Sequence, residues 1–149
     1  MSQSIQIAPE DLAARRKIMA LQEAVQALPQ VEFVKRHHFA QGVYARELTI
    51  PKGVVLVGAV HLQSQINIIS KGDISVMTGT EVVRIKAPFT LVTPAGVKRA
   101  GYAHEETVWT TILGTEETDP EVIKDTLTAI DFEQFEQMRL GLDQHRIGG

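Results

Sequence analysis

The residues best suited to chemistry in this chain lie in a short polar stretch with a spacing of two. His61, Gln63 and Gln65 follow one another at alternate positions, and alternate residues of a β-strand point to the same face. A histidine can act as acid, base or ligand anchor at neutral pH, and each amide offers a hydrogen-bond donor and an acceptor. We expect these side chains either to bind a polar ligand or to be buried and hydrogen-bonded to one another.

Arg99 and Trp109 complete the predicted ligand-binding residues. A guanidinium that points inward needs a carboxylate or phosphate partner, which could come from Glu47, from Glu105 or from a ligand. An Arg99 that points outward would simply be solvated. For Trp109 the alternative is a purely structural role, in which the indole packs in the core.

A second group of reactive types, Tyr102, His104 and Glu105, lies just before Trp109. A histidine beside a carboxylate can form an acid–base pair, but neighbouring residues on an extended strand point to opposite faces. Packing is therefore the favoured interpretation. If the protein is an enzyme, we expect His61 or His104 to act as the base and Tyr102 as the acid.

We predict no bound metal and no cofactor. A first-row metal needs three or four histidine or carboxylate ligands, whereas the polar stretch supplies one histidine and neutral amides, and Arg99 would add a positive charge. The chain has no cysteine, so thiolate ligands and cysteine nucleophiles are excluded. Motifs typical of serine hydrolases, nucleotide hydrolases, zinc peptidases and dinucleotide-binding enzymes are absent.

Composition and charge narrow the class of protein further. The 149 residues are 44% apolar, which suits one domain with an ordinary core. A net charge of −3 argues against nucleic-acid binding, and we expect the basic residues 35–38 to form a solvated turn before the first strand. No run is long and apolar enough to cross a membrane, and the first residues lack the pattern of a secretory signal.

The elements that position these residues form an all-β core between helices. Apolar residues at helical spacing predict a helix over residues 9–28, and Pro29 ends it. After Gly114 we expect a short helix over 121–129 and a further helical piece over 131–142. We divide the chain into an N-terminal helical segment (1–30), a β-barrel (31–115) and a C-terminal helical extension (116–149). The expected strands cover 31–34, 43–50, 54–61, 65–70, 73–78, 81–85, 90–93, 97–101 and 107–113.

The spacing of glycines and polar residues resembles the two motifs of the cupin superfamily. Gly53 and Gly72 stand where the first motif has its glycines, and His61 occupies the position of its second histidine. Pro94 and Gly96 reproduce a turn of the second motif. The resemblance implies a cupin double-stranded β-helix, that is, a jelly-roll barrel. The other ligand positions depart from the pattern: Ala59 replaces a histidine, Gln65 the glutamate, Arg99 the last histidine and Ala103 an asparagine.

Longer runs, including INIISKG and KRAGYAHEETVWTTI, resemble short cupin-like proteins of tailed bacteriophages and prophages over about residues 31–120. This resemblance implies a location in the bacterial host cytoplasm, with incorporation into a virion as an alternative. Members of that group often carry histidines where this chain has Gln63 and Gln65.

Three functions follow as hypotheses. The first is a non-enzymatic phage or prophage accessory or structural protein that binds a small polar or anionic ligand in its barrel. The second is an isomerase, epimerase or lyase that acts on a sugar or small acid. The third is an anti-defence protein that sequesters a ligand through Arg99 and the basic residues 35–38.

We also expect a homo-oligomer, with a dimer favoured, and phage structural proteins as further partners. The two terminal helices carry apolar stripes that need cover, and a symmetric pair of chains could bury them. The stripes consist of Leu12, Ile18, Leu21, Val25 and Leu28, and of Phe132, Phe135, Met138 and Leu142.

Overall fold

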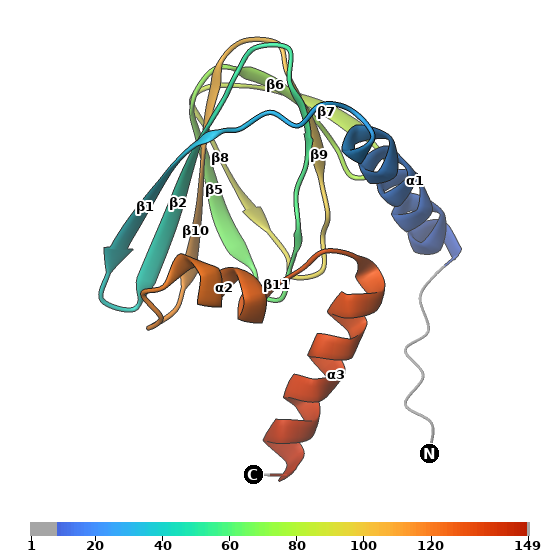
Figure 1. Cartoon of the computed structure of the whole chain (residues 1–149), viewed down its shortest axis with the longest axis vertical. Helices are drawn as coiled ribbons and strands as arrows, with labels where there is room; N and C mark the ends of the chain where they lie inside the picture. The colour runs from blue at the N-terminus through green and yellow to red at the C-terminus, as the bar shows by residue number, and fades with distance from the viewer. Residues whose placement is uncertain (1–8, 149) are drawn as a thin grey trace.

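Two antiparallel β-sheets form the body of the protein (Figure 1). The computed structural model describes the backbone of residues 9–148 and the side chains of residues 9–141. The sheets have the strand orders β1-β2-β10-β5-β8 and β3-β9-β6-β7, and a short pair joins β4 to β11. The strands are β1 (Val34–Ala40), β2 (Val43–Ile50), β3 (Val55–Val57), β4 (Val60–His61), β5 (Gln65–Lys71), β6 (Asp73–Met77), β7 (Val82–Lys86), β8 (Phe89–Thr93), β9 (Ala100–Ala103), β10 (Thr107–Gly114) and β11 (Thr128–Ala129).

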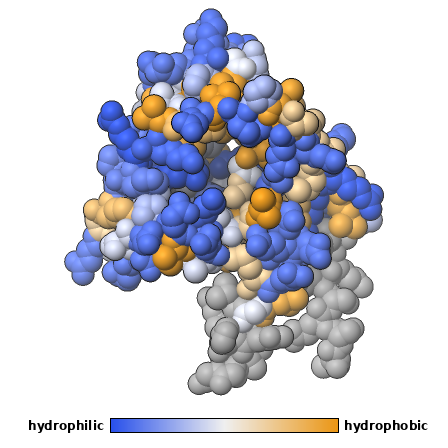
Figure 2. All heavy atoms as spheres, viewed as in Figure 1, coloured by the Kyte–Doolittle hydropathy of each residue, from blue (hydrophilic) through white to orange (hydrophobic). Residues whose placement is uncertain are grey.

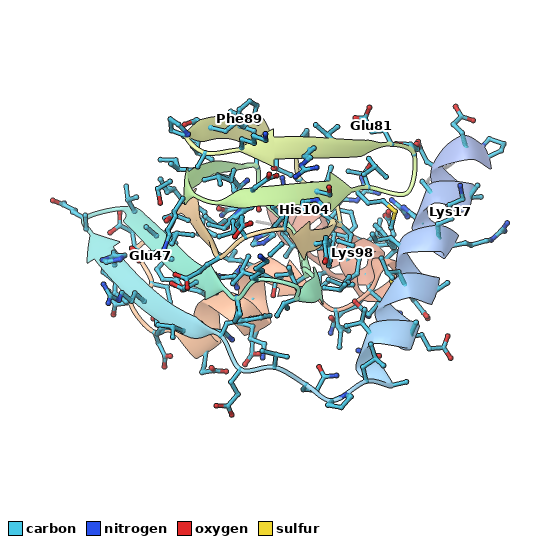
Figure 3. All side chains as sticks on the ribbon, turned by 90° about the horizontal axis from the view of Figure 1, so that it is seen from above. Lys17, Glu47, Glu81, Phe89, Lys98 and His104 are labelled. Carbon is cyan, nitrogen blue, oxygen red and sulfur yellow. The ribbon has the colours of Figure 1, made fainter. Side chains whose placement is uncertain are left out.

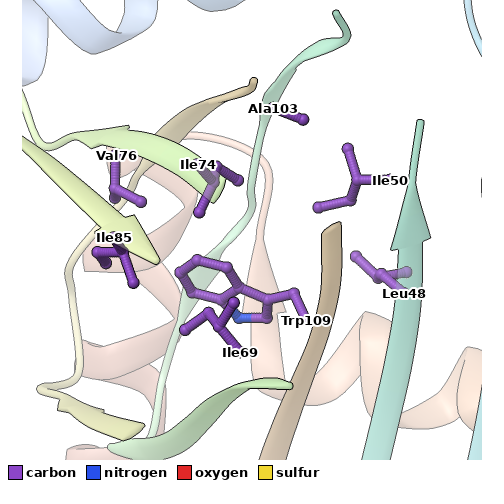
Figure 4. Packing of buried hydrophobic residues seen from close by; sticks show 8 residues of the cluster. All are labelled: Leu48, Ile50, Ile69, Ile74, Val76, Ile85, Ala103 and Trp109. Carbon is purple, nitrogen blue, oxygen red and sulfur yellow. The ribbon is translucent and has the colours of Figure 1, made fainter. Parts of the chain in front are cut away.

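Strict alternation along the strands creates the core between the sheets. In β10 every second residue from Thr107 to Leu113 is buried, because successive side chains of a strand point to opposite faces. The main apolar cluster draws on both sheets (Figure 4), so it holds them together face to face. The prediction of an all-β core between helices is thereby confirmed. The cluster contains Leu48, Ile50, Ile69, Ile74, Val76, Ile85, Ala103 and Trp109.

A buried hydrogen-bond network ties three neighbouring strands together beside this apolar cluster. The Oδ1 atom of Asn67 on β5 accepts hydrogen bonds from Trp109 Nε1 and Thr111 Oγ1 of β10, each at 2.9 Å. Its Nδ2 atom donates to Thr93 Oγ1 of β8, also at 2.9 Å. Asn67 is fully buried, and this network fixes the orientation of the Trp109 indole.

The tight turn between β5 and β6 depends on Gly72. Its φ is +105°, in the region that glycine adopts without strain. A Cβ atom at this position would lie 2.6 Å from the Cα of Thr107. The glycine therefore lets the start of β10 approach the turn.

Several strand boundaries differ from the sequence-based expectation. The strand expected over 31–34 is not formed over 31–33, and β1 begins only at Val34. The basic residues 35–38 are part of β1 and not of a turn, because they pair in register with β2. The strand expected over 54–61 is divided into β3 and β4, with Gly58 and Ala59 between them. The strand expected over 97–101 begins only at Ala100, since residues 94–99 form a loop.

The N-terminal helix α1 (Pro9–Gln26) lies along the flank of the second sheet (Figures 1 and 3). Ile18 is fully buried there, while Lys17 faces solvent. Of the expected apolar stripe, Leu21 and Val25 are half-buried, and Leu12 and Leu28 are exposed. The barrel of the same chain thus covers the centre of the stripe.

The C-terminal segment returns to the barrel through α2 (Pro120–Leu127), β11 and α3 (Phe132–Gly148). The expected helix over 121–129 stops at Leu127 because Thr128 and Ala129 pair with β4. Phe135 of α3 is buried against Val60 and Ala129, with Phe132 and Met138 beside it. The aromatic stripe is therefore covered within one chain, although the side chain of Leu142 lies outside the described residues.

Phe135 also contacts the loop before β9. A Cβ atom on Gly96 would lie 3.0 Å from the Phe135 ring, so the helix and this loop pack closely. The backbone N–H of Gly96 donates to the carbonyl oxygen of His61 at 2.9 Å. The loop is held between α3 on one side and β4 on the other.

The outer surface is mainly hydrophilic in the view of Figure 2, and hydrophobic residues are exposed there in separate groups. Within the described part of the chain, none of the helices has both the length and the apolar composition needed to cross a membrane.

Replacement of Asn67 by leucine should lower the free energy of unfolding by about 2–4 kcal/mol, because it leaves the Trp109 N–H and the Thr111 hydroxyl without a buried partner. Urea denaturation would measure the change. Ser70→Ala, at an exposed position of the same strand, serves as the control. A loss for Asn67→Leu no larger than for the control would contradict the structural importance of the network.

Candidate functional site

A cavity of about 90 Å³ opens inside the barrel, between the two sheets. By the same measure a single water needs about 10–15 Å³, so the cavity has room for a ligand of several non-hydrogen atoms. Its polar lining comes from five residues, and apolar residues of the core complete the wall. The polar residues are Arg46 of β2, His61 of β4, Gln65 of β5, Arg99 of the 94–99 loop and Thr111 of β10.

Four of the five residues expected to bind a ligand share this cavity. His61, Gln65, Arg99 and Trp109 all line it, and Arg99 lies over the indole with its guanidinium carbon 5.0 Å from the ring centroid. Arg99 therefore points inward. The outward alternative for this side chain was wrong, and the indole belongs both to the core and to the cavity wall.

The Gln63 side chain does not contribute to the cavity lining. Strand geometry ends at His61, and residues 62 and 63 form a bend, so simple alternation does not continue to this position. The backbone of Gln63 contributes instead: its carbonyl oxygen accepts a hydrogen bond from Gln65 Nε2 at 3.2 Å. The expected hydrogen bond between the side chains of His61 and these amides is not formed.

His61 is a neutral imidazole at physiological pH. Burial lowers its pKa to about 4, and the positive charges of Arg46 and Arg99 contribute in the same direction. Its Nδ1 atom is shielded from solvent and has no hydrogen-bond partner among the described residues. The side chain can therefore donate or accept a hydrogen bond toward a ligand, depending on its tautomer.

Arg46 was absent from the sequence-based site, although strand alternation could have identified it. It lies on β2 in phase with the buried residues Tyr44, Leu48 and Ile50, which places its side chain toward the interior. Burial lowers its pKa, but an arginine stays protonated at neutral pH. Its Nε atom is buried without a partner.

The electrostatics of the cavity are positive. Burial lowers the pKa of Arg99 to about 10, which still leaves it charged at pH 7. Among the described residues, neither Arg46 nor Arg99 forms a salt bridge. Among the residues that the structure describes, no aspartate or glutamate lines the cavity. The expected carboxylate partners lie elsewhere, since Glu47 contacts His38 and Glu105 contacts Lys52.

Tyr102 and His104 lie outside this cavity. Their rings contact each other edge to face at 4.9 Å, and His104 Nε2 lies 2.6 Å from Ser75 Oγ. Ser75 alternates with Ile74 and Val76, which line the cavity, so this group occupies the outer face of β6 and β9. The structure does not bring His61 together with the proposed acid Tyr102.

The residues of the cavity do not fit a resident metal ion. Within the described residues, no group of three or more His, Asp or Glu side chains could hold one. Ala59 lines the cavity without a donor atom, and two guanidinium groups would repel a divalent cation.

A larger groove of about 1050 Å³ lies on the other side of β3, between α1 and the segment from α2 to α3. Its lining contains Lys98, whose Nζ atom donates to the carbonyl oxygen of Ile130 at 2.9 Å. In the described part of the chain, no buried polar atom without a partner belongs to a residue of this groove. The groove is larger than the barrel cavity, but the residues Arg46, His61 and Gln65, which carry buried polar atoms without a partner, line the barrel cavity.

Comparison with solved structures establishes the class of fold. KdgF from Halomonas sp. is 16% identical, with a TM-score of 0.52 over 62% of this chain and 88% of that one. A cupin superfamily protein from Desulfitobacterium hafniense DCB-2 is 10% identical, with a TM-score of 0.50 over 60% and 85%. The fold is the cupin jelly-roll barrel. No protein-family model and no curated protein matches the sequence.

The pKa of His61 provides a test of the cavity. A histidine in the unfolded chain has a pKa near 6.5. Between pH 6.5 and about 4, His61 is therefore protonated in the unfolded chain but stays neutral in the folded protein. The contribution of His61 should therefore lower the free energy of unfolding as the pH falls through this window. An NMR titration, assigned by the signal lost in His61→Gln, should give a pKa near 4.

Arg46→Gln should raise that pKa, because it removes one of the positive charges that disfavour the imidazolium. Arg84→Gln, on the second sheet and paired with Asp73, is the matched control and should leave it unchanged. A pKa of 6 or above in the unmodified protein would show that the imidazole is solvated and would overturn the geometry.

Proposed function

We propose that this protein is a binding protein of the cupin fold that holds a small anion inside its barrel. The observation that carries the proposal is the pair Arg46 and Arg99, which face a cavity with no acidic residue in its lining. A buried charge without a partner is strongly unfavourable. An anionic ligand would supply that partner through charge-assisted hydrogen bonds.

The proposal favours binding over catalysis. A general base needs a pKa near the working pH, whereas that of His61 is about 4. The proposed acid Tyr102 lies on the outer face of the barrel, so it cannot act with His61 on one ligand in the cavity. The isomerase, epimerase or lyase alternative is therefore reduced to the version in which His104 is the base, because His104 contacts Tyr102 at 4.9 Å on that outer face.

The biological setting that we propose is a phage or prophage accessory or structural protein. Its support is the sequence resemblance over about residues 31–120. The anti-defence alternative relied on Arg99 acting together with residues 35–38, and these residues are part of β1, an edge strand that does not line the cavity. The anion-binding proposal does not depend on either setting.

Anion binding can be followed through Trp109, the only tryptophan of the chain. At constant ionic strength, acetate or sulfate should change its fluorescence in a saturable manner. Arg46→Gln and Arg99→Gln should each weaken binding by at least about tenfold, because a hydrogen bond to a charged group contributes about 1.5–3 kcal/mol. Arg84→Gln should bind as the unmodified protein does. If neither these anions nor the hydroxyl-bearing anions glycolate and phosphate produce a saturable change, the proposal fails.

We also propose that the protein forms a homodimer through the outer face of the first sheet. The registers place Ala45, Ile112, Ile66 and Val92 side by side across β2, β10, β5 and β8. Ile66 is 44% exposed and Val92 is 69% exposed. An apolar row on an uncovered sheet face is typical of a self-complementary interface, whereas the barrel of the same chain already buries Ile18 of α1 and Phe135 of α3.

Light scattering at micromolar concentration should report a dimer, and the double substitution Ile66→Lys and Val92→Lys should yield monomers by placing charges in the interface. Val82→Lys is the matched control, since Val82 is 66% exposed on β7 of the other sheet. It should leave the dimer intact. A monomeric unmodified protein would contradict the assembly.

A further inference from the structure

Three buried polar atoms of the barrel cavity lack partners among the described residues: Arg46 Nε, His61 Nδ1 and Gln65 Oε1. All three residues line the same cavity. A buried donor or acceptor that stays unsatisfied is costly, so a ligand that fits the cavity must satisfy these atoms. Their chemical types therefore describe the ligand more closely than the charge of the cavity does.

The orientation of the Gln65 amide is fixed by the backbone. Its Nε2 atom donates to the carbonyl oxygen of Gln63, which is only an acceptor, so the NH₂ end of the amide must point there. The other end, Oε1, is then the one left free, and it can only accept a hydrogen bond. Gln65 is 3% exposed, so bulk water does not replace the missing donor.

Arg46 Nε requires an acceptor, because a guanidinium nitrogen only donates hydrogen bonds. The cavity thus requires a ligand with an acceptor for Arg46 and Arg99 and a donor for Gln65. A simple carboxylate or sulfate offers oxygen lone pairs alone, and it would set one of them against Gln65 Oε1. His61 Nδ1 accepts or donates as the ligand requires and does not decide between the classes.

We infer that the ligand is a small hydroxycarboxylate, whose carboxylate pairs with Arg46 and Arg99 and whose hydroxyl donates to Gln65 Oε1. This inference rests on the proposed function, since it assigns a class to the anion of the same cavity. The size of the cavity, about 90 Å³, suits an acid of a few carbon atoms. A protonated phosphate also combines negative charge with an O–H donor, so the experiment must separate the two sources.

Two matched pairs of anions provide the test: glycolate against acetate, and phosphate against sulfate. Each pair differs in the O–H group, and all four are titrated at pH 6.5 and constant ionic strength, with Trp109 fluorescence and calorimetry as readouts. We expect glycolate to bind about three- to tenfold more tightly than acetate, as one hydrogen bond implies. Phosphate should not bind more tightly than glycolate.

The variant Gln65→Met removes the acceptor while it retains a side chain of similar length. It should abolish the preference for glycolate and leave acetate binding in place. Gln63→Met is the matched control, because only the backbone carbonyl of Gln63 takes part, and it should keep the preference. Should Gln65→Met fail to fold, the comparison of glycolate with acetate on the unmodified protein still decides the inference.

The four anions distinguish a wrong ligand class from a wrong proposed function. If acetate and glycolate bind equally, the hydroxycarboxylate class is overturned while anion binding stands. If phosphate binds more tightly than sulfate but glycolate binds no more tightly than acetate, the cavity recognises the O–H group of a phosphate. The hydroxycarboxylate inference is then again overturned. If none of the four anions binds, both the hydroxycarboxylate inference and the proposed anion-binding function are wrong.

Discussion

The hydrogen bonds of Asn67 fix the positions of the side chains in the interior of this barrel. One buried amide accepts from Trp109 and Thr111 and donates to Thr93, so a single side chain on β5 links the strands on both of its sides. Because a buried polar network is stabilising only when every member is satisfied, the indole has one orientation. That orientation provides the surface on which the Arg99 guanidinium lies, and with it the positive charge of the cavity.

The positions that resemble the ligand positions of the cupin motif here create a positive electrostatic environment. Ala59 offers no side-chain donor, Gln65 is neutral and Arg99 is a cation. Arg46 of β2 adds a second positive charge from the first sheet. The imidazole of His61 responds with a pKa of about 4, because adding a third charge to a buried site with two guanidinium groups is unfavourable. The cavity is therefore positively charged and disfavours protonation of its imidazole.

Much of the fold was predictable because its signals are local. Glycine turns such as Gly72 and the alternation of β10 depend on neighbouring residues, and so does the start of α2 at Pro120. The cavity residues on regular strands followed from the same alternation, and Arg46 could have been included by it. Gln63 could not, because the bend after His61 changes the direction of the side chain.

Contacts between distant segments carried no local signal. The packing of the terminal helices on their own barrel depends on tertiary contacts of Ile18 and Phe135. An apolar stripe in the sequence does not show whether it packs against the same chain or against a second copy. The stacking of Arg99 on Trp109 depends on the path of a loop, which spacing does not define. The Asn67 network likewise joins three strands that are far apart in sequence.

The close packing of Gly96 against Phe135 connects the C-terminal helix to the loop that borders the cavity. The loop that includes Gly96 also carries Arg99, and it is bonded to the backbone of His61. Arg99 and His61, which both line the cavity, are thus connected to α3 through this loop. The position of Arg99 therefore depends in part on how Phe135 packs against the loop.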